Sequence, residues 1–341
     1  MDPLTHALSG AILARSIPKS PIPHRYVWLL AAVAMLPDID FVLKFISDTT
    51  YLRHHRGITH SFLMLPIWAW LLFSLLPQQK KQQPLMPWLL ASALLMHIFL
   101  DLVTSFGTMT LAPFSDTRAS LDLLFIIDPI FTLLLLLPLI FIPVFKRHGR
   151  TIAITSLALT AFYLSIAYYY HEKAIELARH HHPNAATVQA LPQPFSPFIW
   201  MLVASYPSKE VRTVIDFRPA FSGTSSLMPD SLVEQFTFGN ELSNPKWQEL
   251  PAMRGVTDIN HLPGIAFYRW FARFPVLIRR DQKVIEFADL RFETMNLERE
   301  AFRLRVELGD DATGKKARAW LIWKKDREID LTDATAPPTS W

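Results

Sequence analysis

The sequence predicts a two-part protein: an α-helical polytopic membrane domain with five to six spans, some short or broken, followed by a small β-rich soluble domain. Half of the 341 residues are hydrophobic. Residues 1–170 contain 12 Lys and Arg, 8 Asp and no Glu, whereas residues 171–341 contain 22 basic and 22 acidic residues. Because only the second half has the charge density of a soluble domain, we place the boundary near residue 170, giving domains 1–170 and 171–341.

Composition also narrows the function. The net charge of +4 comes from the first half, where basic residues stand between apolar runs. This pattern is typical of membrane orientation rather than of nucleic-acid binding, so no nucleic-acid partner is expected. The chain has no cysteine, which excludes disulfides and thiolate metal sites. Any metal must therefore be held by His, Asp or Glu.

Six apolar segments of the first half are candidates for membrane spans, which need about 20 residues. The clearest are 84–106 and 121–145, and 151–170 ends in a tyrosine cluster of the kind found at membrane interfaces. Residues 61–76 are short. Residues 25–45 are interrupted at "PDID" (37–40), and the sequence leaves open whether residues 3–17 span the membrane.

Short basic loops predict the orientation. Residues 18–25, 78–83 and 146–150 carry Lys and Arg and fall on one side, which we take as cytoplasmic. The opposite side then holds residues 37–40, residues 54–60 and the C-terminal domain. Arg56 lies on this outer side against the rule, so its charge needs a functional reason or an inverted topology.

Histidines and aspartates from separate segments are expected to meet at the outer side. His97 and Asp101 are four residues apart in one predicted helix and share a face. A buried carboxylate costs several kcal/mol unless it is paired or bound to metal. Imidazole and carboxylate suit zinc or manganese. The first candidate ligands are therefore His6, Asp40, His55, His60, His97 and Asp101.

Each of these segments also has a structural interpretation. Residues 37–40 could end a helix with carboxylates in water, and residues 54–61 could be an interfacial loop or a helix start capped by Thr59. Asp38 could be a ligand or could orient a histidine, and we assign it a catalytic role. Arg56, the second residue given a catalytic role, could hold a phosphate oxygen or simply anchor the chain at the interface.

The ordered set "LTHAL", "PDID", "HRGITHS", "HIFLDLVTSFGT", "LAPFSDTRASLD" and "FIIDPIF" resembles the YdjM-like family of bacterial inner-membrane, metal-dependent hydrolases. The resemblance is strong over residues 1 to about 135. It implies an inner-membrane location, so the outer side, where the basic loops place the C-terminal domain, is expected to be the periplasm. That family is distantly similar to zinc-dependent phospholipase C and to zinc nucleases, which carry three zinc ions. Their helix with His and Asp four residues apart matches His97 and Asp101.

The chain departs from this wider pattern because it has no Glu before residue 172, and hence no second His–x–x–x–Glu pair. The resemblance implies one to three ions, with one or two expected here. Asp128 is a further candidate metal ligand, with capping of a helix before Pro129 as its alternative.

The second half predicts strands at 198–206, 211–217, 266–280, 283–292, 301–308 and 317–325, with a hairpin loop at 310–316 and a disordered end. We find no catalytic set in it. The resulting hypothesis is a hydrolase that uses a metal-activated water on a phosphoester, a membrane lipid or a lipid-linked substrate. The alternatives are a non-enzymatic scaffold with a structural metal and, ranked last, a transporter.

Overall fold

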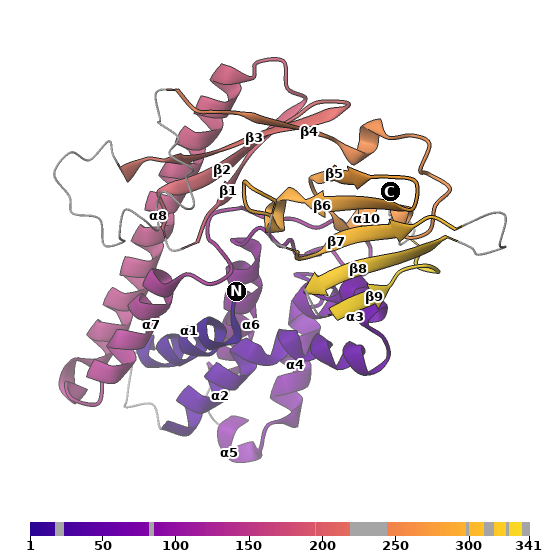
Figure 1. Ribbon diagram of the computed structural model, residues 1–341. Helices are drawn as coiled ribbons and strands as arrows, with labels where there is room; N and C mark the ends of the chain where they lie inside the picture. Colours follow the sequence, from indigo (N-terminus) through magenta and orange to yellow (C-terminus); the bar gives the residue numbers. More distant parts are fainter. Residues whose placement is uncertain are drawn as a thin grey trace. The chain divides into compact units, whose positions relative to one another are not determined.

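The computed structural model describes residues 1–17, 24–81, 85–194, 196–218, 244–297, 300–309, 317–324 and 327–335. They form two compact units, mainly Met1–Tyr169 (unit 1) and Tyr170–Gln193 with Pro197–Thr339 (unit 2). Helices dominate the first part of the chain and strands the second, as predicted (Figure 1). The hairpin loop expected at 310–316, the expected disordered end at 336–341, and parts of the basic loops (18–23 and 82–83) lie outside the described residues.

Unit 1 is built from α-helices joined by short 3-10 helices. α1 begins with Asp2 as its N-cap, whose side chain accepts a hydrogen bond from the Thr5 amide, and with Pro3 in the first turn. The elements are α1 (Pro3–Ser16), α2 (His24–Met35), η1 (Leu36–Phe45), α3 (Asp48–His54), η2 (Ile58–His60), α4 (Leu65–Leu75), α5 (Gln78–Lys81), α6 (Met86–Leu102), α7 (Pro129–Phe141), η3 (Lys146–His148) and α8 (Gly149–His181), of which α8 continues into unit 2.

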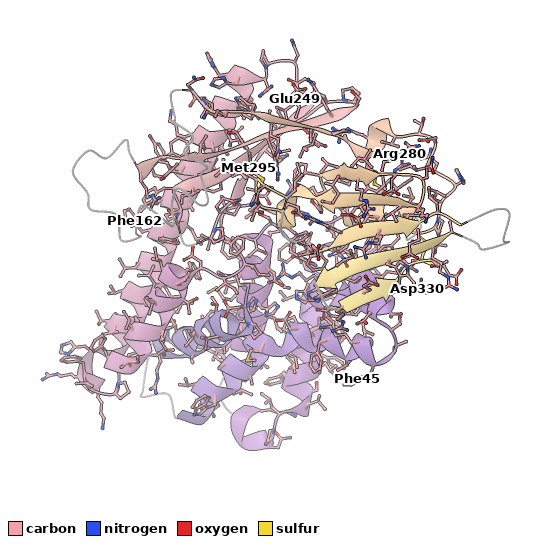
Figure 2. The ribbon with its side chains drawn as sticks, in the orientation of Figure 1. Phe45, Phe162, Glu249, Arg280, Met295 and Asp330 are labelled. Carbon is pink, nitrogen blue, oxygen red and sulfur yellow. The ribbon has the colours of Figure 1, made fainter. Side chains whose placement is uncertain are left out.

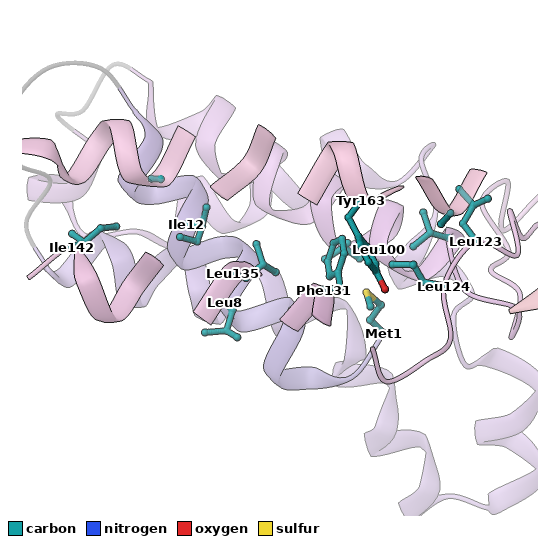
Figure 3. Close-up of a cluster of buried hydrophobic side chains, with 13 residues drawn as sticks. Met1, Leu8, Ile12, Leu100, Leu123, Leu124, Phe131, Leu135, Ile142 and Tyr163 are labelled. Carbon is teal, nitrogen blue, oxygen red and sulfur yellow. The ribbon is translucent and has the colours of Figure 1, made fainter. Parts of the chain in front are cut away.

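Two apolar clusters hold these helices together, and the first joins α1, α2, α4 and α6. α1 crosses α2 so closely that a Cβ atom at Gly10 would lie 2.2 Å from the Leu30 carbonyl oxygen, so only glycine fits there. The second cluster joins α1, α6, α7 and α8 (Figure 3). In it, Phe131 and Tyr163 lie with ring centroids 6.3 Å apart. Both clusters anchor α1 and α6, the two helices that carry His6, His97 and Asp101.

The described residues contain two segments long and apolar enough to cross a membrane, Tyr26–Phe45 and Lys146–His181, and a third if the bent pair Asp48–His60 and Leu65–Leu75 is one span. α6 and α7 are apolar but shorter, with 17 and 13 residues. At about 1.5 Å per residue, α6 extends for roughly 25 Å, against a hydrocarbon core of about 30 Å. The described residues therefore do not confirm the predicted five to six spans, and show two or three segments of full length.

Unit 2 contains two antiparallel sheets with strand orders β1-β2-β3-β4 and β5-β6-β7-β8-β9. Both faces of β2 are buried, which is why its sequence shows a continuous apolar run instead of clean alternation. Trp200 and Leu202 pack with Ala174 and Ala178 of α8, whereas neighbouring residues pack against β5 and β6. The strands are β1 (Thr187–Pro192), β2 (Ile199–Ser205), β3 (Lys209–Asp216), β4 (Gln248–Pro251), β5 (Pro275–Arg280), β6 (Val284–Asp289), β7 (Arg303–Glu307), β8 (Arg318–Lys324) and β9 (Arg327–Asp330).

One predicted strand is partly wrong. Residues 266–280 divide into helix α10 (Ile265–Phe271) and strand β5. Gly264, with φ of 72°, starts the helix, and Ile265, Tyr268 and Phe271 are buried at a spacing of three residues. Helical packing of this aromatic face outweighs the β propensity of its residues. The short helices η5 (Met253–Gly255) and η6 (Leu290–Phe292) complete the unit.

Candidate metal centre

α6 supplies two side chains to a buried polar cluster in unit 1. His97 and Asp101 lie one helical turn apart on the same face, and both are fully buried. The Nε2 atom of His97 is 3.5 Å from Oδ2 of Asp101. The predicted pairing of these two residues is therefore present in the fold.

η1 brings a third residue to the cluster. The chain changes from α-helix to 3-10 helix at Leu36, with Pro37 in the first turn. The side chain of Asp38 is 27% exposed, and its Oδ1 atom lies 3.5 Å from Nε2 of His60 and 3.7 Å from Nε2 of His97. Asp38, expected from the sequence to be a ligand or an orienting group, thus lies close enough to both histidines to share one ion with them.

The segment before α4 brings His60 into the cluster. Arg56 adopts a left-handed conformation with φ of 58°, and a Cβ atom at Gly57 would lie 2.7 Å from the His54 carbonyl oxygen. Two backbone hydrogen bonds to the loop after α6 hold this tight turn. The Met109 amide donates to the Arg56 carbonyl oxygen, and the Phe62 amide donates to the Thr110 carbonyl oxygen. His60 is fully buried as a result.

The four ligand atoms fit a single divalent ion. Those of Asp38, His60, His97 and Asp101 lie within 4.8 Å of one another. The two histidine Nε2 atoms are 3.0 Å apart, and that of His60 is 3.1 Å from Oδ2 of Asp101. Atoms roughly 2.0–2.1 Å from a tetrahedral zinc ion would be about 3.3 Å from one another, which matches these spacings.

Hydrogen bonds on the far side of each imidazole orient it. The Nδ1–H group of His97 donates to the Ala34 carbonyl oxygen at 2.6 Å, so a neutral His97 presents the lone pair of Nε2 to the cluster. Nδ1 of His60 lies 2.9 Å from the Thr59 hydroxyl. Oδ2 of Asp101 is buried and accepts no hydrogen bond from the described residues. A cation among these atoms would satisfy the lone pair and the carboxylate together.

The other oxygen of Asp101, Oδ1, meets positively charged or imidazole groups. The Arg56 Nη2 atom lies 2.8 Å away, His6 Nε2 lies 3.3 Å away, and the Met1 amino group donates a hydrogen bond to it. Asp101 therefore turns Oδ1 to these groups and Oδ2 to His60 and His97. His6 stacks on His97, with ring centroids 3.7 Å apart, but is not one of the four clustered residues.

Arg56 is buried, and its guanidinium group also donates to the Thr104 hydroxyl at 3.1 Å. Its environment makes it a partner of Asp101. Contact with a substrate phosphate, the role considered from the sequence, stays a prediction. The positive charge of Arg56, which departs from the positive-inside rule, is thus balanced locally by the carboxylate of Asp101.

Asp40 and His55, two of the predicted ligands, form a neighbouring pair. Oδ1 of Asp40 lies 3.0 Å from Nδ1 of His55, and its Oδ2 accepts a hydrogen bond from the Arg56 amide at 2.9 Å. Oδ2 also lies 3.8 Å from Nδ1 of His60. These contacts make Asp40 a support for the turn that carries Arg56 and His60. Neither Asp40 nor His55 belongs to the four clustered residues.

Asp128 caps a helix, the alternative considered from the sequence. One carboxylate oxygen accepts a hydrogen bond from the Phe131 amide at 2.9 Å, and the other accepts one from the Tyr163 hydroxyl at 2.9 Å. Both oxygens are thus occupied within α7 and α8. We therefore leave Asp128 out of the candidate site.

Several supporting groups were not identified from the sequence. They are the Ala34 carbonyl, the Thr104 hydroxyl and the Met1 amino group. Thr59 was considered only as a helix cap. Every residue has a backbone carbonyl, so its role cannot be predicted from the sequence. Likewise, a threonine that supports a histidine through a tertiary contact cannot be distinguished in the sequence from other threonines.

The fold and the site define a helical membrane protein with a candidate metal centre, and sequence comparison agrees on the class. Residues 1–174 match the YdjM inner membrane protein family, and the chain belongs to that family. It is also similar to the uncharacterized protein YfhP of Bacillus subtilis (strain 168), with 30% identity over 139 residues. This match covers 38% of the chain and 42% of YfhP, less than half of either. No solved structure is significantly similar to the chain.

Proposed function

We propose that this chain is a membrane-bound, metal-dependent hydrolase whose divalent ion is held by Asp38, His60, His97 and Asp101. The main support is the set of distances within this cluster. The two Nε2 atoms lie 3.0 Å from each other and 3.1 to 3.7 Å from the carboxylate oxygens of Asp38 and Asp101. Two imidazoles and two carboxylates favour zinc, with manganese as the second choice.

A divalent ion in this position would lower the pKa of a water molecule and polarise a phosphoryl or carbonyl oxygen. Residues around the cluster would orient the groups that hold this ion. Ala34 and Thr59 hold the two imidazoles in place, and Arg56 holds Oδ1 of Asp101 so that Oδ2 faces the histidines. Since Asp38 alone of the four clustered residues is partly exposed, substrate would approach from its side.

A phosphoester of a membrane lipid or of a lipid-linked molecule is the substrate class we favour. Membership of an inner membrane protein family supports it. The spacing of His97 and Asp101, on which the expected resemblance to zinc-dependent phospholipase C rests, is a second reason. The basic loops favour the outer side of the membrane for residues 37–40 and 54–60, which carry Asp38 and His60, and they favour the same side for unit 2.

Elemental analysis of the purified full-length protein tests the metal site. We expect about one equivalent of divalent metal in the wild type and its loss in His97→Ala and Asp101→Ala, since removal of one ligand leaves an incomplete set. His54→Ala is the matched control, because His54 is exposed and adjoins the same segment. Wild-type protein without stoichiometric metal, purified without chelators, would contradict the proposal.

Hydrolysis assays then separate an enzyme from a scaffold. Bis(4-nitrophenyl) phosphate and phospholipids in mixed micelles are suitable substrates, with His97→Ala as the inactive control. Stoichiometric metal without hydrolysis of any phosphoester or carboxylic ester would instead favour the scaffold with a structural ion.

A further inference from the structure

η1 is a ten-residue 3-10 helix, which is long for this conformation. With three residues per turn, residues i and i+3 lie directly above one another, so η1 has three columns of side chains. The column Pro37, Asp40 and Leu43 faces inward: Pro37 and Asp40 are buried and Leu43 is half-buried. The other two columns therefore flank the buried one and face outward.

The first outward column contains a clustered residue. Asp38, Phe41 and Lys44 share it, with Phe41 one turn beyond Asp38 and 52% exposed. Lys44 places its Nζ atom 4.2 Å from the centroid of the Tyr51 ring. An approach to Asp38 along η1 therefore passes over the apolar ring of Phe41.

The second outward column is entirely apolar. Ile39, Val42 and Phe45 are all exposed, and Phe45 reaches 86% exposure at the outside of unit 1 (Figure 2). Exposure of so many large apolar side chains on one short helix is unusual for a surface in water.

The surroundings of η1 identify what covers this face. η1 is the second half of Tyr26–Phe45, one of the segments long and apolar enough to cross a membrane, and the chain belongs to an inner membrane protein family. The apolar column Ile39, Val42 and Phe45 thus extends the exposed apolar surface of a candidate membrane span. Asp38, the exposed edge of the metal centre, lies beside this surface, whereas His60, His97 and Asp101 are fully buried.

We propose that the metal centre opens to the lipid phase beside Phe41, and that its ligand is the head-group phosphate of a membrane phospholipid. The acyl chains of that lipid pack on Ile39 and Phe41, and its phosphate reaches the ion at Asp38. This proposal rests on the proposed function, because it requires a metal at the four-residue cluster. It adds the route of entry, which runs from the bilayer and not from water.

Because the chain has no cysteine, single-cysteine variants give a clean test. Phe41→Cys, Phe45→Cys and Glu249→Cys in the full-length protein are labelled with a nitroxide and reconstituted in phosphatidylcholine nanodiscs. Glu249 is the water-facing reference, with its side chain 62% exposed on β4 (Figure 2). Collision with oxygen, which concentrates in lipid, is compared with collision with a water-soluble nickel chelate.

At Phe41 and Phe45 we expect oxygen to relax the label much more than the nickel chelate does, with the reverse at Glu249. Added Mn²⁺ should broaden the label at Phe41 more than at Phe45. At about 2.0 Å per residue, Phe41 lies roughly 6 Å along the helix from Asp38 and Phe45 roughly 14 Å. Nickel accessibility at Phe41 equal to that at Glu249 would overturn the proposal, since the centre would then open to water.

A second measurement identifies the ligand. Electron spin echo spectra of Mn²⁺ bound to the unlabelled wild-type protein in the same nanodiscs should show coupling to ³¹P, and the His97→Ala protein should not. Bound Mn²⁺ without ³¹P coupling would overturn the lipid ligand while leaving the metal site intact. Protein that binds neither Mn²⁺ nor Zn²⁺, by elemental analysis, would instead refute the proposed function on which this inference depends.

Discussion

Removal of the Thr59 hydroxyl is expected to weaken metal binding without removing a ligand. When Nε2 of a neutral His60 binds the metal, Nδ1 carries the proton and donates to the Thr59 hydroxyl. In Thr59→Val this Nδ1–H group loses its 2.9 Å partner, while Nε2 remains in the cluster. A lost hydrogen bond that leaves a buried donor unpaired costs about 1–3 kcal/mol, which corresponds to a factor of roughly 5 to 150 in Kd. Support residues of metal-bound histidines have effects of about 10- to 100-fold, in agreement with this range.

Competition titration against a chromophoric zinc chelator, with the protein in detergent, measures this change. Thr59→Ser keeps the hydroxyl group and is expected to bind zinc as the wild type does. His60→Ala sets the limit for complete loss of the ligand. If Thr59→Val binds zinc within about twofold of the wild type, against the 10-fold or larger effect expected of a supporting residue, the hydrogen bond does not support His60 and the assigned orientation of that imidazole is wrong.

Three further outcomes are expected. Gly10→Ala should lower the thermal unfolding midpoint, because its Cβ atom would lie 2.2 Å from the Leu30 carbonyl oxygen and such overpacking costs about 1–3 kcal/mol. Asp128→Ala should cost about 1 kcal/mol of stability as a lost cap but leave the metal content unchanged, and loss of metal would show that Asp128 is a ligand. Metal should be released on acidification, measured by dialysis and elemental analysis, because the ion binds deprotonated imidazole and carboxylate groups and protons compete for the same atoms.

The part of the site that could be predicted from the sequence depends on α-helix geometry. His97 and Asp101 share a face in any α-helix, whatever the packing around it, so their spacing alone was informative. The helical first part and β-rich second part followed in the same way from apolar run length and charge density. These features are local, and the fold preserves them.

The choice between Asp38 and Asp40 could not be made from the sequence. Both lie in "PDID", and which of them faces the histidines depends on where the α-helix changes to three residues per turn. The 3-10 helix directs Asp40 inward to the turn at Arg56 and leaves Asp38 beside His60 and His97. From the sequence, Asp40 is a first candidate ligand and Asp38 is a ligand or an orienting group, since the position of this transition is not apparent there.

The choice between His55 and His60 has a similar origin. Five residues separate them, but the left-handed turn at Arg56 intervenes, and the loop after α6 holds that turn through the Met109 amide. The result is that His60 is buried among the cluster whereas His55 pairs with Asp40. Contacts between segments distant in the sequence decide this, so no local pattern could have shown it.

The buried charges favour one ion in preference to two or three. Asp38, Asp40 and Asp101 contribute three negative charges when ionised, and Arg56 contributes one positive charge, which leaves a net charge of −2. The Met1 amino group beside Asp101 makes this −1 when it is protonated. One divalent ion brings the sum to 0 or +1, whereas two would leave +2 or +3 in a site where uncompensated charge is costly. A centre that is neutral or weakly positive can accept an anionic phosphoester, and a second or third ion would need acidic residues beyond these three.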